Sequence, residues 1–266
     1  MKNTTTIVPI HPPKFNYGLE ILQSFEKYMD GDLWFVFSTI EDYFSFKSLS
    51  NKDILGFVIP PHMIGANTNI INAKKFYGIS EAFRMGYKYV AVLDSEAEFV
   101  KSFDTDVVYK EIFESKTFKA NNSKNTEYGS GGFLTYETAL ALGLENNFIL
   151  KTKTKDFNLY WWFNELCVYE RDTFNEFYVW YISHPNYNSI KTLSYTFDFM
   201  MYSIWLVVFK GFDIKVYMED VVFITGCIET NYYNNNISNI YKSYADCNLN
   251  HKDIEHIKII IHKDRI

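Results

Sequence analysis

Short, continuous runs of apolar residues alternate with amphipathic segments along the first third of the chain. Three of the runs are rich in β-branched and aromatic side chains, and they span residues 4–10, 33–37 and 87–93. A shorter run at residues 56–59 stops at Pro60. Runs that are apolar on both faces are typical of strands in a parallel sheet covered by helices on both sides.

The segments between these runs have the spacing of helices. Apolar residues recur every three or four positions over residues 19–29 and again over residues 70–85, where Gly86 ends the pattern. The resulting order is β-α-β repeated. We therefore expect an α/β fold, a Rossmann-like α/β/α sandwich with a mainly parallel central sheet.

The second half of the chain shows a weaker pattern. Residues 135–142 and 197–209 have helical character, residues 212–224 favour two short strands, and residues 256–262 resemble a last strand. The Asn- and Tyr-rich residues 231–250 are expected at the surface. The polar, glycine-rich residues 119–132 show no periodicity, so we predict a mobile loop there that closes over a site.

Length and charge narrow the classes of protein. A chain of 266 residues suits a single domain, which we expect to have two lobes, at about residues 1–118 and about residues 133–266. The formal net charge of −6 leaves no basic stripe for a phosphate polymer. We therefore expect no nucleic-acid partner.

Cysteine spacing and hydropathy indicate a cytoplasmic protein. The cysteines Cys167, Cys227 and Cys247 stand far apart, without the spacing of a zinc knuckle or the even count of a disulfide framework. The first residues lack the apolar core of a signal peptide. The most apolar stretch, residues 197–209, is shorter than the roughly twenty residues that span a bilayer. We expect no transmembrane segment, and peripheral association with a membrane stays open.

An acidic triplet follows the clearest strand. Asp94-Ser95-Glu96 comes directly after residues 87–93, and ligands of open α/β sheets bind at the carboxyl ends of strands. Transfer of a sugar from a nucleoside diphosphate leaves a doubly charged diphosphate, whose charge the enzyme must stabilise. Mg²⁺ and Mn²⁺ prefer carboxylate oxygens together with ligand phosphates. The alternative to a binding role is that these acids only cap the strand and face water.

The strand GYKYVAVL followed by this triplet resembles the DxD signature of GT-A fold glycosyltransferases. The likeness extends back to IVPIHPP at the start and to the KKFY segment in the preceding helix. Within this family, the sequence resembles the small bacterial and viral enzymes that build glycan chains. The likeness covers about the first 140 residues. The last acid of the signature is usually Asp, so Glu96 is a departure that puts the metal in question.

The resemblance implies roles for individual residues. It implies that the base and ribose lie near the ends of the first two strands, that a lysine approaches the phosphates, and that the acids hold ribose and metal. The implied donor residues are Pro9, Ile10, His11, Ser38, Thr39, Lys74, Asp94, Ser95 and Glu96, with Asp94 and Glu96 also as metal ligands.

An inverting transferase also needs a base that takes the proton of the acceptor hydroxyl. The resemblance places this base in the second lobe, where Glu165, Asp172 and Asp220 are candidates. We favour Glu165, with Asp220 as the second choice, because Trp161 and Trp162 could form a wall that stacks on a sugar and lowers solvation. Equally, both tryptophans could belong to the core, and a retaining enzyme would need no such base.

Two further features complete the predicted site. Gly131 and Gly132 could let the backbone approach the sugars closely, although loop flexibility explains them as well. His262 could complete a metal site in three dimensions, since the six histidines show no paired metal spacing along the chain.

The sequence thus predicts a hexosyl- or pentosyltransferase that moves a sugar from a nucleotide sugar, a UDP-sugar first, to a hydroxyl of a glycan acceptor with Mn²⁺ or Mg²⁺. Two alternatives stay open. A sugar-1-phosphate nucleotidyltransferase would need a Gly-rich, Arg-containing loop after the first strand, and HPPKFNYG provides none. The other is a noncatalytic carbohydrate-binding protein.

Overall fold

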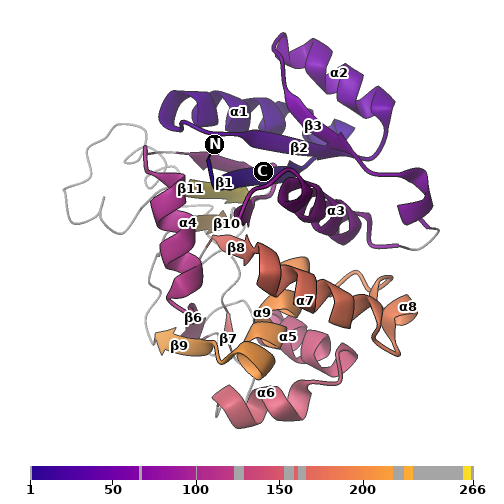
Figure 1. The fold of residues 1–266 in the computed structure, drawn as a ribbon, viewed down its shortest axis with the longest axis vertical. Coiled ribbons are helices and arrows are strands. Elements are labelled where there is room, and N and C mark those ends of the chain that lie inside the picture. The colour runs from indigo at the N-terminus through magenta and orange to yellow at the C-terminus, as the bar shows by residue number, and fades with distance from the viewer. Residues whose placement is uncertain are drawn as a thin grey trace.

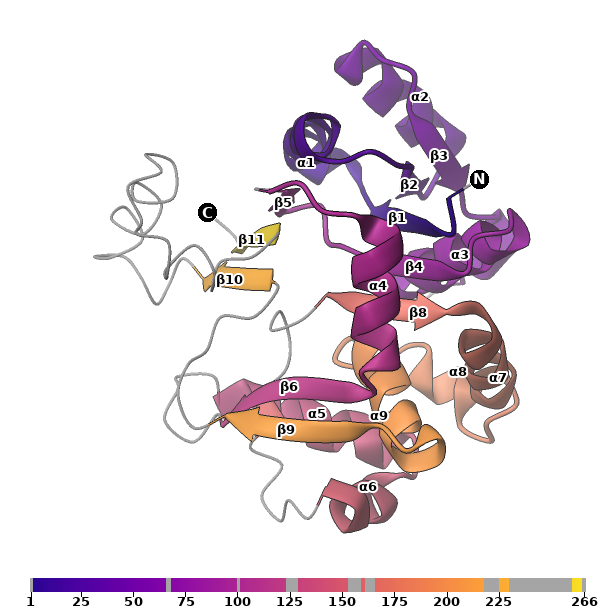
Figure 2. The same cartoon turned by 60° about the vertical axis from the view of Figure 1, so that its left-hand side comes forward.

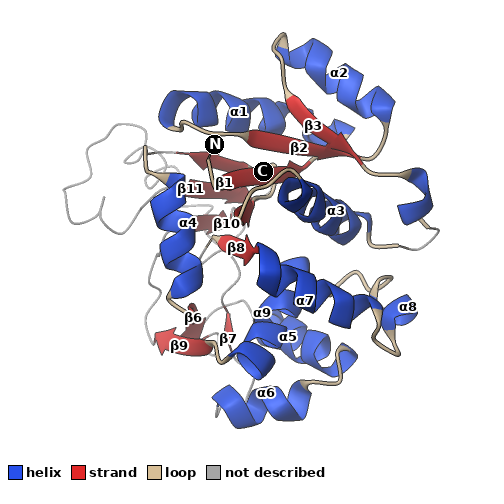
Figure 3. Cartoon of the chain, in the orientation of Figure 1, coloured by secondary structure: helices blue, strands red, loops and turns tan. Residues whose placement is uncertain are grey.

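The structure is a computed structural model, and Figure 3 shows its helices and strands. It describes residues 2–65, 68–99, 101–122, 129–152, 159–160, 166–217, 225–229 and 260–264.

A five-stranded sheet forms the centre of the first half. Its strands are, in spatial order, β3 (Leu55–Val58), β2 (Leu33–Phe37), β1 (Thr4–Pro9), β4 (Tyr89–Val92) and β8 (Cys167–Glu170). The first four run parallel to one another, and β8 pairs antiparallel with β4. The sequence-based prediction of a mainly parallel central sheet is confirmed, and β2 has the predicted bounds.

Helices cover both faces of this sheet. Helices α1 (Phe15–Tyr28) and α4 (Thr105–Glu114) pack on one face, and α3 (Ile70–Arg84) packs on the other, as Figure 1 shows for α1 and α3. A β-carbon added at Gly78 of α3 would lie 2.7 Å from Cγ2 of Val36. The absence of a side chain there lets α3 lie close against the strands. The layers are those of an α/β/α sandwich.

The central strand β1 carries buried threonines, and each hydroxyl has a partner. Thr6 Oγ1 shares a hydrogen bond of 2.6 Å with the hydroxyl of Tyr109, and Thr4 Oγ1 pairs with Thr105 Oγ1 at 2.7 Å. Thr5 Oγ1 donates to the carbonyl of Asp32 at 2.8 Å. A buried hydroxyl without a partner would cost free energy, so these contacts permit polar residues in a fully covered strand.

Two small sheets complete the fold of the described residues. Strands β6 and β9 of the sheet with the order β7-β6-β9 lie at the lower end of α4 in Figure 2, and the other sheet has the order β10-β11-β5. The remaining strands are β5 (Ala97–Phe99), β6 (Thr117–Asn122), β7 (Leu159–Tyr160), β9 (Asp213–Tyr217), β10 (Thr225–Glu229) and β11 (Ile260–Asp264). The remaining helices are α2 (Ile40–Ser50), α5 (Gly129–Ala141), α6 (Glu145–Thr152), α7 (Arg171–Ile182), α8 (Tyr187–Ile190), α9 (Asp198–Lys210) and the short 3-10 turns η1 (Pro12–Lys14) and η2 (Pro61–Met63).

Helix α9 is the most apolar helix of the second half of the chain, as predicted from residues 197–209. It begins at Asp198, whose side chain is buried, and Gly211 ends it in the left-handed conformation with φ of 70°. No helix among the described residues combines the length and the apolarity needed to cross a membrane.

The prediction of a loop over residues 119–132 is wrong at both of its ends. Residues 119–122 belong to β6, which pairs with β9, and α5 begins at Gly129. The helix carries on into the buried residues Thr135, Thr138 and Ala139, and this packing outweighs the helix-weakening effect of the glycines at its start. Residues 123–128 lie outside the described residues.

Other predictions for the second half have mixed outcomes. The first strand predicted within residues 212–224 is present as β9, and the strand predicted at residues 256–262 is present from residue 260 as β11. The second strand of residues 212–224 and the surface segment at residues 231–250 fall outside the described residues.

Candidate functional site

The carboxyl ends of the parallel strands meet at one edge of the central sheet. The amide of Ile10 donates to the carbonyl of Val36 at 3.0 Å, and the amide of Leu93 donates to the carbonyl of Ile7 at 3.0 Å. This register brings the residues that follow β1, β2 and β4 to the same edge. His11, Ser38 and Asp94, predicted as donor-binding residues, are therefore neighbours along it.

The acidic triplet forms the turn between β4 and β5. The carbonyl of Asp94 accepts a hydrogen bond from the amide of Ala97 at 3.1 Å, and this contact closes the turn. Ser95 is buried, and its hydroxyl donates to Glu96 Oε2 at 2.9 Å. The turn lies where the sequence placed it, directly beyond a buried strand.

Each acid of the triplet contacts a lysine from a different element. Nζ of Lys75, on α3, lies 3.0 Å from Asp94 Oδ1, and Nζ of Lys14, at the end of η1, lies 2.8 Å from Glu96 Oε1. The Lys75 ammonium is buried, whereas the Lys14 pair is partly exposed. The two carboxylates are thus held by positive charge from both faces of the sheet.

Lys75 also joins Asp94 to the second half of the chain. Its Nζ lies 3.0 Å from Asp198 Oδ1, at the first position of α9. Burial alone lowers the pKa of a lysine, but the carboxylates of Asp198 and Asp94 raise the pKa of Lys75 above its ordinary value. The ammonium therefore stays charged between its two acids.

Asp198 is in turn held on three sides. The hydroxyl of Tyr169 donates to its Oδ2 at 2.5 Å, and its own amide donates to Asn72 Oδ1 at 3.1 Å. The Asn72 side-chain amide also donates to the carbonyl of Thr196. The carboxylate itself is paired with Tyr169 and Lys75, and it lies at the N-terminus of a helix, whose dipole favours negative charge, so its burial costs less.

Lys74, the lysine predicted to approach the phosphates, has a different environment from Lys75. Its Nζ donates to the carbonyl of Ile10 at 2.6 Å, at the end of β1. Burial lowers the pKa of Lys74 to about 8, although Asp42 nearby raises it. Lys74 therefore lies at the same edge of the sheet, and it loses its proton at a lower pH than an ordinary lysine while staying mostly charged at neutral pH.

The remaining residues predicted to bind the donor surround this edge. Pro9 ends β1, and His11 follows Ile10 beyond it. Burial lowers the pKa of His11, Lys74 lowers it further, and Glu96 opposes both. Thr39 caps α2 by accepting from the amide of Asp42 at 3.1 Å. His11 thus lies within electrostatic reach of both Lys74 and Glu96.

Strand pairing places the backbone of His262 next to the acidic triplet. Strand β11 runs antiparallel to β5 and places His262 opposite Ala97, the residue after Glu96. The same residue pairs with Cys227 in the parallel strand β10. The backbone thus brings the predicted third metal ligand beside the predicted second one.

Most residues predicted for the acceptor side are not placed by the structure. Glu165, Trp161, Trp162 and Asp220 lie outside the described residues. Gly131 and Gly132 lie in the first turns of α5, and Asp172 lies in the first turn of α7. The predictions for these residues stay predictions.

Five residues of the site were missed from the sequence: Lys14, Asn72, Lys75, Tyr169 and Asp198. One signal could have found Asp198, because it is the acid that begins an otherwise apolar helix. A buried acid requires a partner, and Lys75 in the amphipathic helix α3 would have been a candidate. Within the described part of the chain, no cluster of three or more His, Cys, Asp or Glu side chains has the arrangement of a metal site.

Comparison with known proteins gives little further guidance. No protein-family model matches the sequence, and no curated protein matches it. Among solved structures, core-mannan synthase A from Aspergillus fumigatus in its Mn/GDP form is similar, with 14% identity and a TM-score of 0.45, over 82% of this chain and 73% of that chain. A likeness this weak does not indicate a function.

Proposed function

We propose that this protein is a glycosyltransferase that moves a sugar from a nucleotide-sugar donor, a UDP-sugar, to a hydroxyl of a glycan acceptor. The observation that carries the proposal is the turn Asp94-Ser95-Glu96, presented at the carboxyl end of β4 with lysines on both acids. Ligands of open α/β sheets bind at this edge. Acids and lysines together suit a ligand that has both ribose hydroxyls and phosphates.

In this proposal the chain binds the donor along the edge of the sheet. The base and ribose lie against Pro9, Ile10, His11 and Ser38, and Asp94 accepts hydrogen bonds from ribose hydroxyls. Lys14, at the start of α1, and Lys74 supply positive charge for the diphosphate as it leaves. Lys75 holds Asp94 in place, because its ammonium is already fixed by Asp198.

A divalent metal is part of the proposal. Asp94 and Glu96 would provide carboxylate oxygens, and His262, which pairs with Ala97 next to Glu96, would be the third ligand. Mn²⁺ and Mg²⁺ accept such oxygens, and Mn²⁺ also accepts imidazole. When bound, the metal neutralises charge on the diphosphate. Lys14 contacts the same Glu96 carboxylate, so it competes with the metal for that residue.

The acceptor side belongs to the proposal as well. We assign the base to Glu165, with Asp220 as the second candidate, the stacking wall to Trp161 and Trp162, and close backbone approach to Gly131 and Gly132. The first lobe, about residues 1–118, binds the donor, and the second, about residues 133–266, binds the acceptor. The transferred group is a hexosyl or pentosyl unit, and the widely spaced cysteines favour a cytoplasmic location.

Calorimetric titration of UDP, with Mn²⁺ or with EDTA, tests the donor site. Asp94→Asn is expected to weaken binding of UDP about tenfold or more, since a lost charge-assisted hydrogen bond is worth about 1.5–3 kcal/mol. Asp53→Asn is the matched control, because Asp53 is an exposed acid that pairs only with Lys47 among the described residues. Equal binding of UDP to the Asp94→Asn variant and the wild type would contradict the site.

Identification of the reaction products distinguishes the proposed glycosyltransferase from a nucleotidyltransferase and from a carbohydrate-binding protein. A glycosyltransferase releases UDP from a UDP-sugar when a glycan acceptor is present. A nucleotidyltransferase would instead form a nucleotide sugar from UTP and a sugar 1-phosphate and release pyrophosphate. A carbohydrate-binding protein would bind glycans and neither turn over nor bind UDP.

A further inference from the structure

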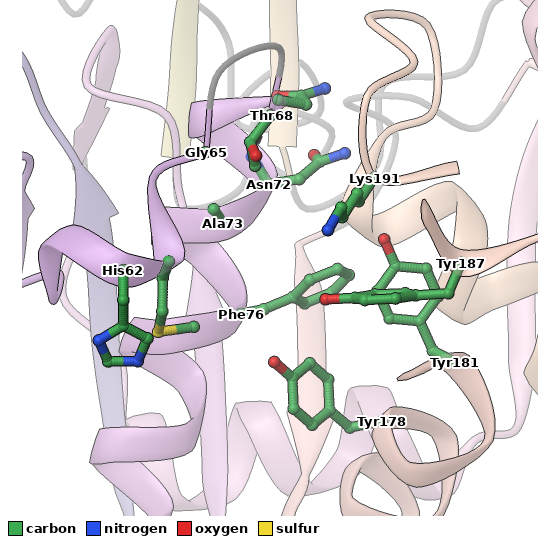
Figure 4. A pocket seen from close by; sticks show the side chains of 12 residues that line it. His62, Gly65, Thr68, Asn72, Ala73, Phe76, Tyr178, Tyr181, Tyr187 and Lys191 are labelled. Atoms are coloured by element: carbon green, nitrogen blue, oxygen red, sulfur yellow. Dashed lines mark hydrogen bonds between the residues drawn. The ribbon is translucent and has the colours of Figure 1, made fainter. Parts of the chain in front are cut away.

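A pocket of about 290 Å³ opens between the N-terminus of α3 and the C-terminal half of α7. We propose that it binds a sugar unit that carries an acid group, as the acceptor subsite of the glycosyl transfer proposed above. Figure 4 shows side chains from α3, α7 and the segment around α8 converging on it. Its volume is near the lower end of the ~300–1,000 Å³ typical of small-molecule pockets, which suits one sugar ring.

Aromatic rings form one wall of the pocket. Phe76 lies with its ring centroid 5.4 Å from that of Tyr181 and 5.9 Å from that of Tyr178, and Tyr187 packs edge-on against Tyr181 at 5.1 Å. These contacts fix the rings in place before a ligand arrives, so little side-chain entropy is lost on binding. Flat apolar faces of this kind stack on the C–H faces of a pyranose ring.

The same wall offers hydrogen-bonding groups. Burial raises the pKa of the Tyr178 hydroxyl, and it raises that of Tyr181 as well, so both stay neutral and able to donate at physiological pH. Thr68 also lines the pocket, whereas the Asn72 side chain, which lines it too, already bonds to Asp198 and Thr196. The hydroxyls of Thr68, Tyr178 and Tyr181 in a ring-lined pocket fit a ligand with several hydroxyls.

The charge of the pocket favours an anion. Lys191 and His62 line it, and among the described residues no Asp or Glu does. The Lys191 ammonium lies 5.2 Å from the centroid of the Tyr187 ring, and it forms no ion pair with any carboxylate of the described residues. The first turn of α3, capped by Asn69, adds the positive end of a helix dipole. A negative substituent on the sugar would therefore be attracted.

The pocket is linked to the donor site by a short chain of contacts. Asn72 lines the pocket and accepts from the amide of Asp198 at 3.1 Å, and Asp198 contacts Lys75, the partner of Asp94. Asn72 and Lys75 are one turn apart on α3, a rise of about 4.5 Å along the helix axis. A sugar in the pocket would thus lie on the acceptor side of the edge that holds the donor.

Titration of the full-length protein with two methyl glycosides tests the inference. Methyl glucuronide and methyl glucoside differ only in the acid group, and we expect the glucuronide to bind about tenfold more tightly. Lys191→Met should remove this difference and leave binding of the glucoside unchanged. Lys101→Met, at an exposed lysine outside the pocket, should behave as the wild type.

A second variant tests the aromatic wall. Tyr187→Leu should weaken both glycosides, because it removes a ring from the wall, and its melting curve shows whether the fold is kept. Equal binding of the two glycosides, or no binding of either, would overturn the inference. So would acetate that displaces the glucuronide at the same concentration, because the pocket would then hold only an anion.

The results of the pocket test and of the donor-site test can be told apart. Asp94→Asn is expected to weaken binding of UDP and to keep binding of the glucuronide. Glucuronide binding in a protein that binds no UDP would support the pocket and contradict the glycosyltransferase. UDP binding without glucuronide binding would support the glycosyltransferase and contradict the pocket.

Discussion

The hydroxyl of Tyr169 lies 2.5 Å from Oδ2 of Asp198 and donates a hydrogen bond to it. Tyr169 belongs to the antiparallel edge strand of the central sheet, and Asp198 begins α9 in the second half of the chain. Both side chains are buried. The bond therefore ties the second half of the chain to the sheet at the point where Lys75 also contacts Asp198.

Tyr169→Phe should destabilise the fold more than Tyr109→Phe. The first change leaves a buried carboxylate short of one donor, which costs about 1.5–3 kcal/mol, whereas the second removes a neutral hydrogen bond worth about 0.5–1.5 kcal/mol. Tyr109 is the matched control, because it is also fully buried and bonds to the hydroxyl of Thr6. Urea unfolding of both variants measures the difference. Equal losses would show that Asp198 does not depend on Tyr169.

Lys75→Met should lower the free energy of unfolding by about 3–5 kcal/mol, because it leaves the buried Asp198 carboxylate without its counter-charge. Asp198→Asn alone should also destabilise, since it leaves the buried Lys75 ammonium with one carboxylate, Asp94, in place of two. The double variant should lose less than the sum of the two, because each single change removes the same ion pair. Urea unfolding of the four proteins measures the coupling. Additive losses would contradict the network.

The central strands could be predicted because their signal is local. Strands covered on both faces are mostly apolar, and residues 33–37 and, apart from Lys88, residues 87–93 meet this condition without reference to the rest of the chain. The strand β8 gave no such signal, because Cys167 to Glu170 is short, ends in an acid and is defined only by its pairing with β4. The formation of such an edge strand depends on pairing with a strand that is distant in the sequence, so its own residues do not predict it.

The glycine-rich residues 119–132 show the opposite failure. Their composition indicated a loop, yet residues 119–122 belong to β6, which pairs with β9, and residues 129–132 belong to α5. The pairing of β6 with β9 joins segments far apart in the sequence, and tertiary packing overrides local propensity there.

The site was predictable only in part for the same reason. Asp94 and Glu96 were found because they follow a strand, a relationship visible in the sequence. Lys75 and Asp198 come from two helices that only the folded chain brings together. Their spacing along the sequence contains no information about their contact.

Lys74 should make stability rise with pH between about pH 8 and pH 10. Its pKa is lowered to about 8 by burial, while an unfolded lysine has a pKa near ~10.4. In that interval the unfolded state binds more protons than the folded state, so the free energy of unfolding increases with pH. Unfolding by urea at pH 7.5 and 9.5 should show a smaller rise in Lys74→Met than in the wild type. Lys101→Met, at an exposed position, should keep the wild-type rise, and an identical rise in Lys74→Met would contradict the assignment.

Lys14→Met should change the balance between metal and lysine at Glu96. Lys14 contacts Glu96 Oε1 at 2.8 Å in a partly exposed pair, and such pairs are worth up to about 1 kcal/mol, so its removal should tighten binding of UDP with Mn²⁺ by about two- to fivefold. Binding of UDP in EDTA should weaken, because a positive charge near the diphosphate is lost. Glu96→Gln should weaken binding with Mn²⁺ and have less effect in EDTA, and Lys47→Met, at an exposed lysine beyond β2, should change neither. Calorimetric titration of UDP measures these changes. Unchanged Mn²⁺-dependent affinity in both the Lys14→Met and Glu96→Gln variants would exclude Glu96 as a metal ligand. The affinity for the metal should change when a ligand loses its charge or when a competing lysine is removed.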